Sequence, residues 1–135
     1  MNIFIDTSAF LAVLNANDQF HPAARQHWDE MLASDTVLFS SNYVILETTT
    51  LLQHRFGIEA ARLFVSDILP ILEIAWIDEP IHKQGMSALL VANRRNLSLV
   101  DCTSFEIMRF MGIDTAFTFD SHFSEQGFDV IPESR

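Results

Sequence analysis

Short apolar runs of strand length alternate along the chain with longer stretches in which apolar residues recur at helical spacing. The first pair is NIFID followed by TSAFLAVLNAN, where a Thr or Ser can cap the helix that follows the strand. Gly57 and Gly112 stand where helical patterns stop, as is typical of helix C-termini. The pattern predicts strands at residues 2–6, 36–40, 71–77, 97–101, 115–120 and 128–132, and helices at residues 7–17, 21–32, 42–56, 58–69, 79–95, 102–111 and from 121 onward.

The repeated order of strand and helix favours the α/β class, in which helices connect parallel strands. Strands that are nearly continuous apolar runs are expected when helices cover both faces of a parallel sheet. We therefore predict an α/β/α sandwich around a central, mostly parallel sheet with Rossmann-like topology. The length of 135 residues, the 49% hydrophobic content and the lack of an internal repeat or linker indicate one domain spanning residues 1–135.

The formal net charge is −10, from eight Lys plus Arg and eighteen Asp plus Glu. Such a chain repels polyanions, which taken alone argues against a nucleic-acid ligand. Carboxylates that bind divalent cations would overstate the working charge, however, because the sequence does not count bound ions. All basic residues except Lys83 are arginines, whose planar fork suits bidentate contact with phosphate or carboxylate.

Cellular location is constrained by what the chain lacks. It carries one cysteine, which cannot form an internal disulfide, and it has no signal segment or apolar run of membrane-spanning length. We expect a cytoplasmic protein with no membrane contact. The cysteine, Cys102, stands beside Asp101, but no His–Cys arrangement for a nucleophile is visible, so a buried structural thiol is the better interpretation.

Four acidic residues stand at positions where chemistry is expected. Asp6 and Asp120 end two predicted strands, and Asp101 begins a helix directly after another. Ligands of doubly wound sheets bind outside the carboxyl ends of the strands where the strand order reverses, so these carboxylates should share one rim. Glu47 lies on an apolar face of its predicted helix, and an acid in such surroundings needs a partner, a proton or a metal.

Each acid also has a plainer interpretation. Asp6, Asp101 and Asp120 all precede predicted helix starts, where an N-cap aspartate satisfies free backbone N–H groups. Glu47 by itself is compatible with a polar groove or a salt bridge. The joint placement of all four favours a metal site, because converging carboxylates repel one another unless a divalent cation lies between them. Magnesium suits such a site, since it prefers hard oxygen ligands and keeps several waters.

Other residues are weaker candidates. The histidines show no i,i+4 pair or cysteine partner that would indicate zinc, although His122, two residues after Asp120, can contact substrate or cap a short helix. Arg94 and Arg95 can contact phosphate, but cations are also favoured at the end of a helix, and we prefer that interpretation. The twelve phenylalanines are mostly core, and four of them are candidates for the wall of the site: Phe4, Phe110, Phe119 and Phe123.

With these residues in place, the sequence resembles the PIN-domain family, and within it the VapC-like toxins of type II toxin–antitoxin systems. The resemblance covers nearly the whole chain and rests on three segments: FIDTSAFLAVLN, SSNYVILETTTLL, and LSLVDCTSFEIMRFMGIDTAFTFDSHFSEQGFDVIP. The order Asp, Glu, Asp, Asp is that of the family, which carries over its acids to Asp6, Glu47, Asp101 and Asp120. Its polar helpers near the metal carry over to Thr7, Asn42, Thr103 and Ser104.

The resemblance implies a ribonuclease that hydrolyses phosphodiester bonds with Mg²⁺ or Mn²⁺, and we expect Asp6 and Asp101 to be the direct metal ligands. It also implies a cognate antitoxin and a homodimer. One alternative is a non-catalytic PIN-like module whose acidic pocket receives a basic side chain of a partner; the complete acid set argues against it. A receiver or phosphatase domain would need a strand-end acidic pair or an Asp-x-Asp motif, and neither occurs. No local motif names the RNA target.

Overall fold

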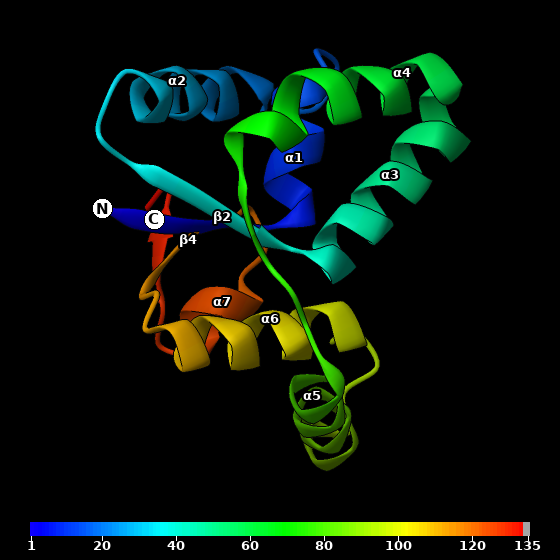
Figure 1. Cartoon of the computed structure of the whole chain (residues 1–135), viewed down its shortest axis with the longest axis vertical. Helices are drawn as coiled ribbons and strands as arrows, with labels where there is room; N and C mark the ends of the chain where they lie inside the picture. The colour runs from blue at the N-terminus through cyan, green and yellow to red at the C-terminus, as the bar shows by residue number, and fades with distance from the viewer. Residues whose placement is uncertain (134–135) are drawn as a thin grey trace.

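The computed structural model describes residues 1–133 and has a sheet of five strands at its centre (Figure 1). The strands run in the order β3-β2-β1-β4-β5, and every neighbouring pair is parallel. The predicted α/β class is confirmed, and the sheet is wholly parallel rather than mostly so. The strands are β1 (Asn2–Ile5), β2 (Val37–Ser41), β3 (Glu73–Ala75), β4 (Thr115–Phe117) and β5 (Asp129–Ile131).

Helices cover both faces of this sheet, as the apolar strands require (Figure 1). One layer holds α1 to α4 and the opposite layer holds α5 to α7, so the predicted sandwich is confirmed. None of the helices in residues 1–133 is long and apolar enough to span a membrane. The helices are α1 (Thr7–Leu14), α2 (His21–Leu32), α3 (Asn42–Phe56), α4 (Ile58–Leu63), α5 (Glu79–Ala92), α6 (Leu99–Met111) and α7 (His122–Glu125).

The core lies where the two layers meet the sheet. Ile3, Phe4 and Ile5 of β1 are almost completely buried, and the rings of Phe10 and Phe64 pack edge to face with centroids 5.2 Å apart. Gly57, in the left-handed region at φ 93°, separates α3 from α4 as predicted. The predicted helix at 58–69 instead changes, after α4, into a π-helical turn (Phe64–Ile68) and a 3₁₀ turn (Leu69–Ile71), because Pro70 has no N–H to continue the helix.

The strand predicted at residues 97–101 is wrong: this segment is the start of α6. Ser98 is the N-cap of the helix and forms a capping box with Asp101, three residues later. The apolar residues of this segment then continue at helical spacing toward the core, with Phe105 and Met108 buried. Asp101 therefore reaches the rim of the sheet from the first turn of a helix and not from the end of a strand.

Candidate active site

The strand order reverses between β1 and β4, and ligands of doubly wound sheets bind at the carboxyl ends of the strands at such a point. Asp6 directly follows β1, and its backbone N–H donates to the carbonyl of Phe117 at the end of β4 (3.1 Å). Asp120 lies in the loop after β4, three residues beyond Phe117, so the strand predicted at residues 115–120 ends three residues earlier than expected. Both side chains stand at the predicted rim.

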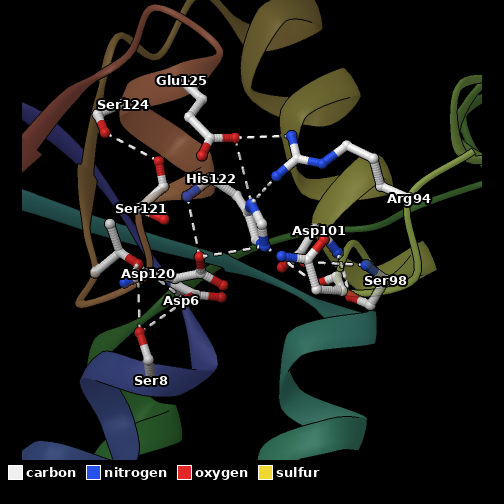
Figure 2. A network of polar contacts seen from close by, with 12 residues as sticks. Asp6, Ser8, Arg94, Ser98, Asp101, Asp120, Ser121, His122, Ser124 and Glu125 are labelled. Atoms are coloured by element: carbon white, nitrogen blue, oxygen red, sulfur yellow. Dashed lines mark hydrogen bonds and ion pairs between the residues drawn. The ribbon is translucent and has the colours of Figure 1, made fainter. Parts of the chain in front are cut away.

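Three aspartates from three segments of the chain converge at this rim (Figure 2). Asp6 comes from the end of β1, Asp101 from the first turn of α6 and Asp120 from the loop before α7. The three carboxylates also interact electrostatically, since the charges of Asp101 and Asp120 both raise the pKa of Asp6. The rim thus gathers three of the four predicted acids.

One carboxylate oxygen of each aspartate accepts hydrogen bonds from neighbouring groups of the protein. Oδ2 of Asp6 accepts from the hydroxyls of Ser8 (2.8 Å) and Thr118 (3.0 Å). Oδ2 of Asp101 accepts from the backbone N–H of Ser98 (3.1 Å), and Oδ1 of Asp120 accepts from the backbone N–H of His122 (3.0 Å). Within residues 1–133 the second oxygen of each carboxylate accepts no hydrogen bond. Helix capping therefore explains one oxygen of Asp101 and leaves the other for a ligand.

Burial and mutual repulsion make this cluster electrostatically unfavourable. Burial, with smaller repulsions from Asp101 and Asp120, raises the pKa of Asp6 to about 6, although hydrogen bonds from Ser8 and Thr118 oppose the rise. Burial and the charge of Asp120 also raise the pKa of Asp101, against the hydrogen bonds from Ser98 and the influence of His122. A cation between the carboxylates would relieve both penalties.

His122 lies against the aspartates and is largely buried. One ring nitrogen of His122 and one carboxylate oxygen from each of Asp101 and Asp120 lie within 4.8 Å of one another. Both ring nitrogens are already engaged, however: Nε2 lies 3.0 Å from the carbonyl of Asn96, and Nδ1 lies 3.4 Å from Oε2 of Glu125. Because a carbonyl only accepts, Nε2 donates there and has no free lone pair for a metal.

The pKa of His122 reflects this position. Burial lowers it, but Asp120, the hydrogen bond with Glu125, the carbonyl of Asn96 and the charge of Asp101 together outweigh burial, so the pKa is raised. A protonated ring satisfies Asn96 and Glu125 at the same time. His122 is thus better suited to hold Asp120, whose Oδ1 lies 3.7 Å from Nε2, than to ligate a metal.

Arg94 clamps the helix that carries His122. Nη1 of Arg94 donates to Oε2 of Glu125 at 2.9 Å, and Nη2 approaches Nδ1 of His122 at 3.5 Å (Figure 2). Arg94 lies two residues past the end of α5, so it does not stabilise the last turn of that helix in the way our preferred interpretation supposed. Instead it connects the segment between α5 and α6 to α7, which sits beside the aspartates.

Glu47, the fourth predicted acid, is half-buried on α3 and lies next to the first turn of α6. It lines a shallow groove together with Tyr43, Leu99 and Val100, and the last of these directly precedes Asp101. No hydrogen bond or ion pair within residues 1–133 joins Glu47 to the aspartates. It borders the site, and its membership of the site stays a prediction.

The predicted helpers divide into two groups. Thr7 adjoins Asp6, and its buried hydroxyl has no hydrogen-bond partner within residues 1–133, which leaves it available to a ligand shell. Asn42 instead clamps the backbone of Ile77 through both side-chain atoms (2.7 and 3.4 Å). The hydroxyls of Thr103 and Ser104 donate to carbonyls of the preceding turn of α6. These last three side chains therefore have structural partners.

Ser8, Thr118 and Ser98 hold the aspartates, and sequence reasoning did not single them out. Ser8 links the segment after β1 to the loop after β4, because its Oγ donates to Asp6 and accepts from the backbone N–H of Phe119 (3.0 Å). Thr118 likewise accepts from the N–H of Asp120 (3.0 Å) while donating to Asp6. The only sequence signals were a Ser two residues after one Asp, a Thr two residues before another, and the Ser98-x-x-Asp101 spacing.

Cys102 and the predicted wall residues complete the surroundings. Cys102 is buried, and burial together with Asp101 and Glu106 raises the pKa of its thiol, which disfavours the thiolate that a nucleophile needs. Phe4 and Phe123 are core residues with no exposed surface, whereas Phe119 lines a cavity next to Asp120. The prediction for Phe110 is wrong: it is 78% exposed, because the last turn of α6 turns it to solvent.

The donor set fits a hard divalent cation. It offers carboxylate oxygens from three aspartates, each held in place by a hydrogen bond at its other oxygen, and a buried unpartnered hydroxyl at Thr7. Oxygen donors of this kind suit Mg²⁺ and Mn²⁺. Asp6 and Asp101 are the most buried of the three and would lose most by staying charged without a cation.

Comparisons with known proteins assign this parallel α/β fold to a family. The sequence model of the PIN domain matches residues 3–129, so the chain belongs to the PIN-domain family. Within that family it is 36% identical, over 97% of this chain and 99% of the relative, to the 23S rRNA-specific endonuclease VapC20 of Mycobacterium tuberculosis. The predicted resemblance to VapC-like PIN domains is confirmed.

Solved structures agree with the sequence comparison. The crystal structure of Mycobacterium tuberculosis VapC20, a Sarcin-Ricin loop cleaving toxin, matches with a TM-score of 0.83 at 35% identity and covers 93% of this chain and 95% of that one. FitAcB from Neisseria gonorrhoeae matches with a TM-score of 0.69 at 18% identity, covering 96% of each chain. The second likeness speaks for the fold alone.

Proposed function

We propose that this protein is a divalent-metal-dependent endoribonuclease that hydrolyses phosphodiester bonds in RNA. The observation that carries the proposal is the convergence of Asp6, Asp101 and Asp120, each with one oxygen held by the protein and one left over. The similarity to a 23S rRNA-specific endonuclease over almost the whole chain supports the choice of RNA and makes 23S rRNA the first substrate to test. The cation is Mg²⁺ or Mn²⁺.

The residues have distinct parts in the reaction. Asp6 and Asp101 would hold the cation, Asp120 would add a third carboxylate at the same rim, and Glu47 would join the site from α3. The chemistry supplied by a cation held there is activation of water and stabilisation of the charge that develops on the phosphate and the leaving oxygen. Ser8 and Thr118 orient Asp6, Ser98 orients Asp101, and His122 holds Asp120.

The proposal includes partners. We infer a cognate antitoxin that blocks the site by placing an arginine among the aspartates, and a homodimer of this chain; the likeness to a protein described as a toxin supports the antitoxin. The acidic site itself favours such an arginine, because its charge relieves the same repulsion that a cation relieves. Sedimentation velocity of the purified chain tests the dimer, and growth arrest on induction, reversed by co-expression of a candidate antitoxin, tests the antitoxin.

The decisive experiment incubates the purified chain with total cellular RNA and Mg²⁺ or Mn²⁺, and maps the new ends by sequencing. Asp101→Asn preserves the shape of the side chain and its capping bond from Ser98, so it should fold normally and lose cleavage by at least about 100-fold. Asp6→Asn should behave in the same way. EDTA is the metal control, and Asp114→Asn, an acid outside the cluster, is the protein control.

Cuts at a few sites that need both the metal and Asp101 would establish the enzyme and disclose its substrate. Full activity in both Asp6→Asn and Asp101→Asn would refute the site assignment. A folded, antitoxin-free chain that binds Mn²⁺ and cuts no RNA would instead favour a non-catalytic module whose acidic pocket binds a partner.

A further inference from the structure

A cavity of about 330 Å³ adjoins the aspartate cluster on the side of Asp120. Two phenylalanines form one wall: the rings of Phe20 and Phe119 stack with centroids 4.7 Å apart and an interplanar angle of 11°. Val130 and Pro132 add further apolar surface. We name this cavity the Phe20–Phe119 pocket.

Its aromatic wall is held rigidly but remains open. The side chain of Asp18 accepts from the backbone N–H of Phe20 (2.8 Å), and this turn fixes the residue at the start of α2. Phe119 is held from the other side, since its N–H donates to Ser8. In spite of the stacking, 41% of Phe20 stays exposed. The stacked pair therefore offers an accessible aromatic surface at the wall of the cavity.

The chemistry of the pocket selects one part of an RNA. The carboxylates of Asp120 and Glu133 lie at its wall and repel a phosphate, whereas a neutral base can stack on the aromatic surface. Only a base that is unpaired and turned out of its stack presents a free face to such a wall. Because one ribose separates a base from its own phosphates, a base in the pocket would place its phosphate just outside the pocket, at the aspartate cluster, where the proposed cation would offset the repulsion.

We propose that the Phe20–Phe119 pocket receives an unpaired base of the RNA substrate next to the phosphate that is cut. The proposal rests on the proposed ribonuclease function and adds a determinant of specificity to it. The pocket requires a nucleotide that is already unstacked or easily turned out, so the enzyme selects loops over duplexes. It also offers a source of RNA affinity that does not depend on phosphate contacts, in a chain with a net charge of −10.

The test couples a change in the protein to a change in the RNA. The substrate is a synthetic hairpin of the sarcin–ricin loop, together with a series in which each loop nucleotide in turn is abasic. The variants are Phe20→Leu, which removes the aromatic face, and Ala23→Leu, which fills the pocket from α2 without removing a packed ring. Phe56→Leu is the matched control, because Phe56 is similarly exposed (49%) at the end of α3 and away from this pocket.

We expect one loop position at which the abasic change lowers the kcat/KM of the wild type by about 5-fold to 150-fold. Phe20→Leu should lower kcat/KM on the intact hairpin by a similar factor and should be insensitive to the abasic change at that position. Ala23→Leu should show the same insensitivity to the abasic change. Phe20→Trp, which keeps an aromatic face, and Phe56→Leu should both be as sensitive to the abasic change as the wild type. If the loss of kcat/KM caused by Phe20→Leu and the loss caused by the abasic change multiply independently at every loop position, the pocket assignment is wrong.

A binding measurement separates this proposal from the proposed function. In the Asp101→Asn background, the affinity for the end-labelled hairpins should show the same coupling between Phe20 and one base. Coupling in binding without any cleavage by the wild-type protein would retain the pocket and reject the ribonuclease. Cleavage by the wild type without coupling in either measurement would retain the ribonuclease and reject the pocket.

Discussion

At the residue scale, Asp6 combines a fixed position with an unfavourable charge. It is almost wholly buried, accepts two hydroxyl hydrogen bonds and has its pKa raised from 3.8 to about 6. A raised pKa means that the folded state binds the proton more tightly than the unfolded state does. The stabilisation from the protonated form is therefore complete below about pH 3.8 and is lost as the pH rises through about 6. A bound cation removes this loss.

Replacement of Asp6 by Asn should stabilise the metal-free protein at neutral pH. Asn lacks the charge but keeps an oxygen that Ser8 and Thr118 can donate to. In EDTA at about pH 7.5, we expect Asp6→Asn to raise the free energy of unfolding by up to about 3 kcal/mol, seen as several degrees in Tm. The gain should disappear below about pH 4, where the wild-type carboxyl is protonated.

Thermal unfolding with and without Mg²⁺ checks the assignment to the metal. Saturating Mg²⁺ should raise the Tm of the wild type more than that of Asp6→Asn, because the variant has lost a ligand. Equal Tm values for the two proteins at neutral pH in EDTA would show that the burial of Asp6 carries no charge penalty.

At the element scale, the packing of α5 against α6 places Asp101. Gly85 of α5 faces Thr103 of α6 with no room between them: an added Cβ would lie 2.5 Å from Cγ2 of Thr103 and 3.1 Å from its backbone nitrogen. The glycine that interrupts this helical sequence is therefore a packing requirement. Since Thr103 lies two residues after Asp101, any shift of α6 that relieves such a contact also moves the aspartate.

Gly85→Ala should consequently destabilise the fold and weaken the site together. Alanine has the higher helix propensity, so a stabilised helix would be expected if the contact were loose. We expect instead a loss of about 1 to 3 kcal/mol in a denaturant titration, with weaker Mn²⁺ binding. Ser87→Ala, at an exposed position of the same helix, is the control, and Thr103→Ser should recover part of the loss by removing Cγ2.

At the scale of the whole molecule, the net charge limits how the proposed RNA substrate can be bound. With eight basic residues against eighteen acidic ones, few phosphates can be neutralised by side chains. The release of counterions that makes most nucleic-acid binding sensitive to salt is then small. Affinity has to come from the site cation and from contacts with bases, which is the arrangement that the Phe20–Phe119 pocket provides.

The dependence on monovalent salt should therefore be shallow. Between about 50 and 200 mM KCl, at constant Mg²⁺, we expect kcat/KM on the hairpin to fall by less than about 10-fold, where six to ten phosphate contacts would cost about a thousandfold or more. Steady-state cleavage across this range measures the slope. A steep fall would indicate a basic RNA-binding surface that the charge balance does not predict.

The sequence by itself determined the fold class and predicted three acids that the fold brings to one rim. Apolar runs and helical spacing are local signals, and they predicted the parallel sheet, the helical layers and the aspartates that follow β1 and β4. The same local signals failed at residues 97–101, where an apolar stretch of strand length is a helix start. Ser98-x-x-Asp101 is a capping box, and its hydrogen bonds decided the conformation.

Tertiary structure decided what depends on distance between segments far apart in the chain. Thr118 holds Asp6 across 112 residues of sequence, and Arg94 reaches Glu125 and His122 across 31 and 28 residues; no local pattern encodes these contacts. Phe20 and Phe119 likewise become one wall only when α2 packs beside the loop after β4. Composition and periodicity indicate whether a segment forms a helix or a strand and which of its faces is buried. The second carboxylate oxygens of the three aspartates and the Phe20–Phe119 pocket depend instead on which segments the strand order brings together.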